Sequence, residues 1–447
     1  MAIKAKLTTF DTTMIVVSLV IGIGIFRTPA IVAGSTQTPF LFFTAWILGG
    51  LISLFGALTY AEIGSRFSKP GAFYKVVAES YHSAFAFMLN WASVLVVNGA
   101  GAAAVAMIGA EYLNPVILPA RLQTQLATQL TATGLIIFLV VINYLGIKTG
   151  AWAQNILSLM KIGMILLLVL AAFRSRGIET PGPVEAVATR PFWIALASGL
   201  ISVFYTYGGY QCTINFGADV KRAQRKMPTA IFFGIFIIIA CYLLINAAYY
   251  KILGITGIAQ AKLVAAELAH IVLGKMGYLF ISLAIFFSAM GFVNVTLMQI
   301  PRAYYAMAED GALPYIFKRV NSKTQVQEFT LLFFGATILL SIYFLGTFEN
   351  LVNYVMFIDS LNLAVVASTL FSLRRKARLE GSYGGYKVPL YPLLPAIFVL
   401  FLFSVSLNVL LTQTRPALFG IAIFSSGYPI FLFMRKISKK KTQNQEA

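Results

Sequence analysis

The sequence runs Ile15-Val16-Val17-Ser18-Leu19-Val20-Ile21-Gly22-Ile23-Gly24-Ile25-Phe26 in its first apolar segment and Val203-Phe204-Tyr205-Thr206-Tyr207-Gly208-Gly209-Tyr210-Gln211 in a later one. Each stretch has a pair of glycines at its centre, where glycine destabilises a helix and permits the backbone to unwind. Inside a bilayer, unwound backbone is tolerated only where it is buried in protein or lines a cavity. The two stretches therefore predict two membrane helices that are broken at mid-membrane.

The composition of the whole chain places these stretches in a membrane protein. Of the 447 residues, 59% are hydrophobic and only 11% are charged, and the mean hydropathy is +0.82. A soluble domain has about 45–50% apolar and about 25% charged residues, which excludes a water-soluble enzyme. Two cysteines and two histidines, without metal-ligand spacing, give no reason to expect a cofactor, a metal site or catalytic residues.

Apolar segments long enough to cross a bilayer follow one another along the whole chain. A spanning helix needs roughly 20 mostly apolar residues. On this criterion we expect an all-α membrane protein with twelve transmembrane helices, in one domain over residues 1–447 with no separate soluble part. The predicted spans are 11–34, 39–66, 81–112, 128–147, 151–174, 191–217, 228–253, 275–308, 328–347, 349–374, 389–411 and 416–434.

The net charge of +19 would indicate a nucleic-acid partner in a soluble protein, but here it indicates topology. Cytoplasmic loops of membrane proteins carry an excess of Lys and Arg. With twelve spans, 24 of the 34 Lys and Arg residues lie on the side of both termini and nine lie on the other side. We therefore expect cytoplasmic termini and no nucleic-acid partner. The final lysines, Lys439 to Lys441, are expected to contact anionic membrane lipid or solvent.

The two glycine-interrupted segments also predict a repeat. Paired broken helices at matching positions in two halves are typical of inverted-repeat carriers. Gly22 and Gly208 are 186 positions apart, so residues 11–174 and 191–374 would form two five-helix repeats, followed by two extra helices in 389–434. The alternative is that the glycines only permit close helix packing, which is common in membranes.

A broken helix has a direct chemical use. The N-terminus of a half-helix exposes free N–H groups and a positive dipole end, which suit a carboxylate. Unwound carbonyl groups on the other side of the break suit an ammonium group. A site with both is suited to a zwitterion such as an amino acid.

These motifs resemble those of the amino acid–polyamine–organocation superfamily, and within it the L-type amino acid transporter branch and its bacterial relatives. Gly22–Phe26 is similar to the family's Gly-Ser-Gly-Ile-Phe, with Ile23 in place of serine, and 205–210 is similar to Phe-Ala-Tyr-Gly-Gly-Trp. The resemblance implies the LeuT-type 5+5 inverted repeat. It also implies a substrate site that acts mostly through backbone atoms, formed by Val20, Ile21, Ile23, Gly24, Ile25, Tyr205, Thr206 and Gly208.

A lysine in the fifth span carries a further resemblance. Gln154-Asn155 and the following residues up to Lys161 match the family's Gln-Asn segment that ends in lysine. The resemblance implies that this ammonium stands in for the metal ion of sodium-coupled carriers of the same fold. Lys161 lies about ten residues, or roughly 15 Å, into the predicted span, and a lysine there marks a functional site by default. The alternative is that it snorkels to the membrane surface.

The seventh span contains a similar match, Tyr242-Leu243-Leu244-Ile245-Asn246. Tyr242 and Asn246 are one helical turn apart and share a face. The resemblance implies that they join Lys161 in the ion-like region, and simple interhelical packing is the alternative for Tyr242. Asp359 is the carboxylate placed well inside a later span, where it would either titrate during transport or make an interhelical hydrogen bond.

Together these features predict a secondary active transporter in a bacterial plasma membrane. Sodium-independent exchange of neutral amino acids is the simplest scheme. Proton-coupled symport, in which Lys161 loses its proton during the transport cycle, is the first alternative, because burial lowers the pKa of a lysine. An ion channel or an intramembrane hydrolase is remote. Animal L-type carriers work with a glycoprotein joined by a disulfide from the loop after span three. Because residues 113–127 contain no cysteine, we expect no disulfide-linked heavy chain. The sequence gives no indication of an oligomeric state.

Overall fold

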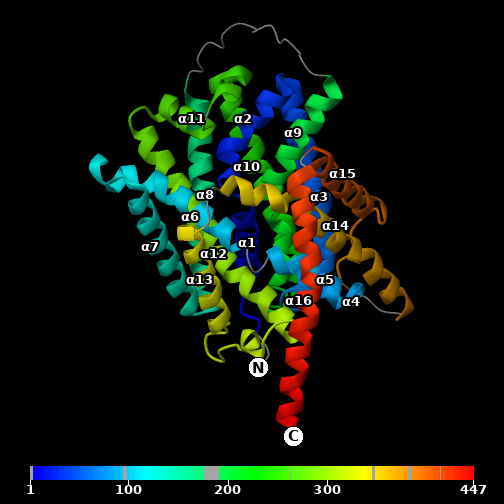
Figure 1. Ribbon diagram of the computed structural model, residues 1–447. Coiled ribbons are helices and arrows are strands. Elements are labelled where there is room, and N and C mark those ends of the chain that lie inside the picture. Colours follow the sequence, from blue (N-terminus) through cyan, green and yellow to red (C-terminus); the bar gives the residue numbers. More distant parts are fainter. Residues whose placement is uncertain are drawn as a thin grey trace.

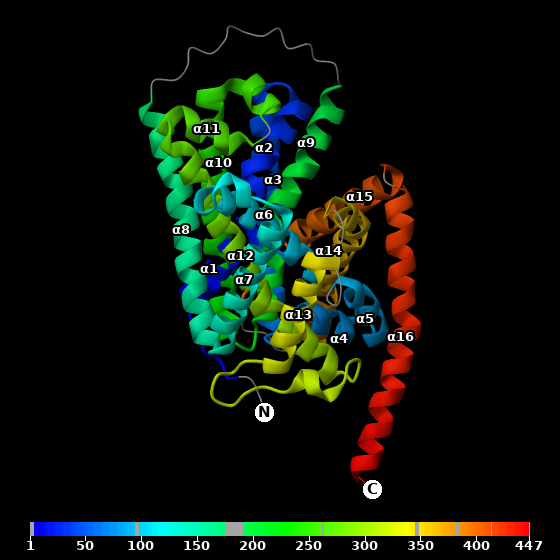
Figure 2. The ribbon, with the colours of Figure 1, turned by 60° about the vertical axis from the view of Figure 1, so that its left-hand side comes forward.

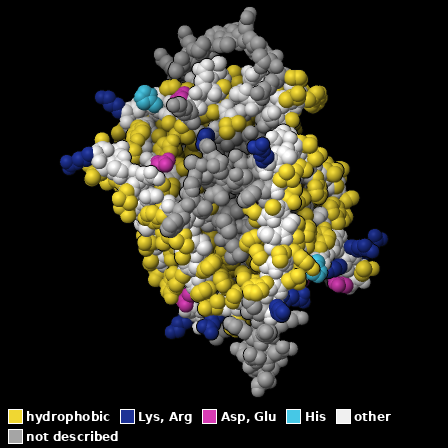
Figure 3. Space-filling model, viewed as in Figure 1, with side chains coloured by type: hydrophobic (Ala, Val, Ile, Leu, Met, Phe, Trp, Pro, Cys, Tyr) yellow, Lys and Arg dark blue, Asp and Glu magenta, His cyan; other side chains and the backbone are white. Residues whose placement is uncertain are grey.

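A computed structural model describes residues 4–93, 98–175, 191–261, 263–344, 348–380, 385–412 and 414–446. Within these ranges the chain is helical, and β-structure is limited to the isolated bridges Leu7–Val220 and Pro70–Phe216. Most of the long helices run in roughly the same direction, and both termini lie at the same end of the molecule (Figures 1 and 2). Hydrophobic side chains cover much of the flanks (Figure 3).

The helices follow the predicted apolar segments closely. The α-helices are α1 Thr9–Val20, α2 Gly24–Thr36, α3 Pro39–Arg66, α4 Ala72–Ser80, α5 Ser83–Ala92, α6 Asn98–Ile117, α7 Gln125–Tyr144, α8 Ile147–Arg174, α9 Phe192–Tyr207, α10 Ala223–Gln260, α11 Val264–Leu273, α12 Met276–Glu309, α13 Glu328–Phe344, α14 Phe348–Leu379, α15 Leu393–Thr412 and α16 Thr414–Glu446. Short 3-10 helices are η2 Ala120–Leu122, η3 Tyr210–Asn215 and η4 Tyr315–Lys318.

Eight helical segments of the described chain are long and apolar enough to cross a membrane: α3, α6, α7, α8, α9 with η3, α10, α12 and α15. The bent pair α1 and α2 would form a ninth. The chain is therefore an integral multi-pass membrane protein, while the count of twelve stays a prediction. The 81–112 segment falls on α5 and α6. Residues 94–97 between them, residues 345–347, and the side chains of Lys439 to Lys441 lie outside the description.

Local sequence signals explain where several helices begin. The Thr8 side chain accepts a hydrogen bond from the backbone of Asp11, whose carboxylate accepts one in return, and this capping box starts α1. Thr38 caps α3, which has Pro39 at its first position. α8 begins at Ile147, directly after Gly146 and four residues before the predicted start. Lys161 therefore lies about 21 Å from the start of its helix, near its midpoint.

The end of the molecule that carries the termini is tied together by contacts between distant segments. The amides of Lys6 and Leu7 both donate to the Asp219 carbonyl at 2.8 Å, and Lys221 donates back to Leu7 at 3.0 Å. The Asp219 carboxylate accepts from Nε and an Nη of Arg302 on α12, at 3.2 and 3.3 Å, and this ion pair is buried. These contacts join the segments that precede α1 and follow η3.

Candidate substrate-binding site

The first glycine motif separates two helices. α1 ends at Val20, α2 starts at Gly24, and the two axes differ by 45°. Ile23 precedes α2 without making a side-chain cap. The Phe26 N–H donates to the Ile23 carbonyl at 3.0 Å, whereas the N–H groups of Gly24 and Ile25 come too early in α2 for an intrahelical acceptor. Gly24 is exposed, whereas Val20 and Ile21 are buried. The positive end of α2 is thus accessible at Gly24.

The second glycine motif has a different geometry. α9 ends at Tyr207, Gly208 is extended with φ −68° and ψ 157°, and η3 begins at Tyr210. Gly209 lies between them with φ +122°, which strongly favours glycine. A Cβ on Gly209 would overlap the carbonyl group of Leu19. The second break therefore packs its backbone directly against the end of α1.

The two breaks also meet at a second point. A Cβ on Gly24 would lie 3.4 Å from Cγ2 of Thr206, which is ordinary contact distance. The Thr206 hydroxyl donates to the Ser202 carbonyl of its own helix at 2.9 Å, so its methyl group is the nearest atom to that position. Thr206 therefore narrows the space opposite Gly24 with its methyl group.

Tyr242 of α10 joins the two breaks through its hydroxyl. The oxygen lies 3.1 Å from the Val20 carbonyl and 3.1 Å from the Thr206 carbonyl. A single hydroxyl proton can be donated to either acceptor, and each carbonyl keeps a second lone pair. The ends of α1 and α9 thus present carbonyl oxygens side by side, in a fully buried setting around Tyr242.

Lys161 of α8 supports the first break from the opposite side. Its ammonium donates to the Ile21 carbonyl at 2.8 Å and to Ser18 Oγ at 3.0 Å. The residue is only 3% exposed, so the lysine does not snorkel. Space for it depends on Gly291 of α12, where a Cβ would lie 2.7 Å from Lys161 Cε. No motif surrounds Gly291, so the sequence alone does not indicate its role.

Two other predicted site residues, Asn246 and Ile25, lie further from the two helix breaks' shared contacts. The Asn246 side-chain amide donates to the Tyr242 carbonyl at 2.7 Å, one turn along α10, so it supports Tyr242 and not the ammonium of Lys161. Ile25 is buried, and its carbonyl lies 3.5 Å from the Tyr249 hydroxyl. The structure therefore brings together Val20, Ile21, Gly24, Thr206, Gly208, Tyr242 and Lys161, with Ile23 beside them, and leaves Asn246 and Ile25 at the edge.

Asp359 of α14 lies near the second break. It is partly exposed, and its charge is within electrostatic range of Tyr205 in α9, Cys212 in η3 and Tyr60 in α3. A carboxylate is therefore present near Tyr205, one of the predicted site residues. The Tyr205 ring packs edge-on against that of Phe204, with 5.9 Å between the ring centroids.

Comparison with known proteins places these features in a family context. The family described as amino acid permease matches residues 7–426. The serine/threonine exchanger SteT of Bacillus subtilis is 27% identical, with 94% of this chain and 95% of that protein covered. The human b(0,+)-type amino acid transporter 1 is 25% identical, covering 96% and 89%. The human cystine/glutamate transporter is also 25% identical, covering 96% and 85%.

Proposed function

The chain belongs to the amino acid permease family, and we propose that it is a sodium-independent exchanger of neutral amino acids that works by alternating access. Family membership makes it a transporter and not an enzyme, as predicted. The exchange activity is supported by the similarity to SteT, which is named as a serine/threonine exchanger. We further propose twelve spans in a 5+5 inverted repeat, with both termini on the cytoplasmic side of a bacterial plasma membrane.

The contact between the two helix breaks is the observation that carries this proposal. The uncapped start of α2 at Ile23 and Gly24 offers N–H groups for an α-carboxylate. The carbonyls of Val20 and Thr206, held side by side by Tyr242, offer acceptors for an α-amino group. Both poles of a zwitterion are matched by backbone atoms, so the amino acid core is recognised whatever its side chain. The narrowing by Thr206 favours a small or medium neutral side chain.

The position of Lys161 supports sodium independence. Its ammonium already supplies a positive charge to Ser18 and to the Ile21 carbonyl, both at the end of α1. Oxygen atoms of this kind are also what a hard cation binds. A second positive charge beside this buried ammonium would be repelled, so the lysine takes the place of a coupling ion.

Proton coupling is the second candidate, and Asp359 favours it. A partly exposed carboxylate near Tyr205 is able to take up and release a proton as its access to water changes. In that scheme substrate entry would be driven by a pH gradient and not by an internal amino acid.

Counterflow in liposomes separates the two schemes. Purified protein is reconstituted, and uptake of labelled serine is measured with and without unlabelled serine inside. Exchange predicts saturable uptake only into loaded vesicles, unchanged when sodium is replaced by potassium. Uptake into empty vesicles driven by a pH gradient would contradict the exchange proposal and support symport. A panel of the twenty amino acids as competitors then defines the side-chain specificity.

We also propose that the protein acts without a disulfide-linked heavy chain. The connection between α6 and α7 has no cysteine, and of the two cysteines Cys241 is buried while Cys212 is only partly exposed. A gel of oxidised membranes without reductant should show the chain at its monomer mass. A higher band that collapses on reduction would contradict this.

A further inference from the structure

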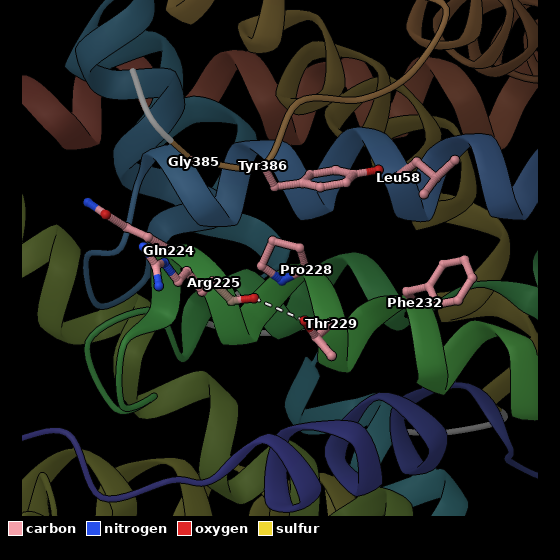
Figure 4. Close-up of a pocket in the computed structure, with 8 residues that line it drawn as sticks. All are labelled: Leu58, Gln224, Arg225, Pro228, Thr229, Phe232, Gly385 and Tyr386. Carbon is pink, nitrogen blue, oxygen red and sulfur yellow. Dashed lines mark hydrogen bonds between the residues drawn. The ribbon is translucent and has the colours of Figure 1, made fainter. Parts of the chain in front are cut away.

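A groove separate from the candidate substrate site opens between α3, α10 and the segment before α15 (Figure 4). Its cavity volume is about 400 Å³. Arg225, Thr229 and Phe232 line it from α10, Leu58 lines it from α3, and Tyr386 lines it from the connecting segment. We call it the α3–α10 groove. It lies outside the two helix breaks.

The α3–α10 groove is polar at one end and apolar at the other. Phe232 is 46% exposed, and the next exposed apolar side chains up α10 are Phe233 and Phe236. At the other end, α10 begins at Ala223, directly after the exposed cations Lys221 and Arg222 and before Arg225. The side chains change from cations to phenylalanines within about two to three helical turns. This change is typical of a helix that passes from the lipid headgroups into the hydrocarbon region.

The polar end has hydrogen-bond donors for an anion. The Arg225 side chain is exposed, and a guanidinium binds phosphate oxygens in a fork geometry. Burial raises the pKa of Tyr386 to about 12, so its hydroxyl stays protonated and able to donate. The Thr229 hydroxyl is already used, since it donates to the Arg225 carbonyl at 3.1 Å. Arg225 is the charged residue among those that line the groove. The Glu62 carboxylate, whose charge also raises the pKa of Tyr386, is paired with Arg66 and Arg374.

We propose that the α3–α10 groove binds one anionic phospholipid of the leaflet on the side of the termini. Its phosphate lies at Arg225 and Tyr386, and one acyl chain lies along Leu58 and Phe232. This proposal does not depend on the transported substrate. A zwitterionic lipid of the same chain length would carry a cationic group into a cationic mouth, and a soluble phosphate would leave the apolar half of the groove uncovered.

The bound lipid would connect two parts of the molecule that meet at this groove. The backbone N–H of Val388, two residues after Tyr386, donates to Glu62 of α3 at 2.6 Å. Arg374 of α14 binds the same carboxylate at 2.6 and 2.8 Å. The Tyr386 side of the groove is therefore fixed to α3 and α14, and a lipid held there contacts α10 across it.

Native mass spectrometry of the purified full-length protein in a neutral detergent tests the site. Phosphatidylglycerol and phosphatidylcholine with identical acyl chains are added in turn, and the retained lipid is counted. Wild type should retain phosphatidylglycerol preferentially. Arg225→Gln should weaken its retention about fivefold, the factor that corresponds to about 1 kcal/mol per cation near an anionic lipid. Thr229→Trp, which fills the groove without changing charge, should weaken it as well.

The control is Arg319→Gln, which removes an exposed cation just after η4, away from the groove. It should retain phosphatidylglycerol like wild type. Equal retention of the two lipids by wild type, or an equal loss in the control and in Arg225→Gln, would overturn the proposal. Displacement of the lipid by millimolar glycerol phosphate would also overturn it, because the acyl chain would then contribute nothing.

Discussion

The two helix breaks share a glycine pair but use it in different ways. At the first break, a Cβ on Gly22 would meet the Val20 carbonyl oxygen at 4.0 Å, and a Cβ on Gly24 would meet Thr206 at 3.4 Å, both ordinary contact distances. At the second, Gly209 combines a positive φ with direct backbone contact to Leu19. The first break therefore needs glycine to keep room for another molecule, and the second needs glycine so that two backbones can touch. The same pattern of two glycines is thus required for a different physical reason at each break.

Gly209→Ala should have the largest effect, because it combines overlap with the Leu19 carbonyl and an unfavourable φ. We expect a loss of about 2–4 kcal/mol in the free energy of unfolding, measured by thermal unfolding in detergent. Gly22→Ala is the matched change at the first break and should stay within about 1 kcal/mol of wild type. Similar losses in both variants would remove the distinction between the breaks.

Gly24→Leu should abolish substrate binding while leaving the fold intact, because its side chain would enter the space opposite Thr206. Binding is measured by isothermal titration with the best substrate of the competition panel. Gly34→Leu is the control, since Gly34 lies on the same helix with nothing within 4 Å of its Cβ position. Wild-type affinity in Gly24→Leu would place the substrate elsewhere.

Lys161→Ala should leave folding intact but lower the exchange rate about ten- to hundredfold, which is the range for losing a charged hydrogen bond. The Ile21 carbonyl would lose the hydrogen bond from the Lys161 ammonium, so the substitution removes a contact of the first break and none of the second. Lys251→Ala removes a lysine that binds carbonyls at the end of α8, such as that of Phe173 at 2.9 Å. Normal exchange is expected there, and normal exchange in Lys161→Ala would contradict the role of this lysine.

Tyr242→Phe should have the smallest effect, since it removes one neutral hydroxyl shared by the two breaks. We expect an affinity loss of about fivefold, corresponding to about 1 kcal/mol. Tyr249→Phe, on the same helix, removes a hydroxyl at the 3.5 Å limit from the Ile25 carbonyl and should change affinity less. If both variants behave alike, the two breaks are not coupled through Tyr242.

The positions of the helices can be predicted well from the sequence because the length and hydropathy of a segment are local properties. Spans such as 39–66 and 275–308 agree with α3 and α12 almost to the residue. The start of α8 lies four residues before the predicted one, since Lys148, Thr149 and Gly150 look like part of a loop although they form the first turn of the helix. The location of a helix in the sequence is thus easier to predict than its first and last residues.

Contacts between helices were harder to predict. The buried position of Lys161 follows from the cost of a charge in a span, but the need for a glycine at position 291 arises only when α8 and α12 are packed together. In the same way, the pairing of Arg302 with Asp219 joins segments 83 positions apart. Such pairs carry no local signal in a single sequence.

The β-bridge between Leu7 and Val220 has a consequence for biogenesis. The residues before α1 are synthesised before their hydrogen-bond partners at Asp219 and Lys221, which follow α9 and η3 in the chain. Until Asp219 and Lys221 have been synthesised, the backbone groups of Lys6 and Leu7 cannot form these hydrogen bonds. A bulky fusion placed directly before Lys4 would obstruct this late pairing, whereas the carboxyl end of α16 offers a position for a tag that leaves it undisturbed.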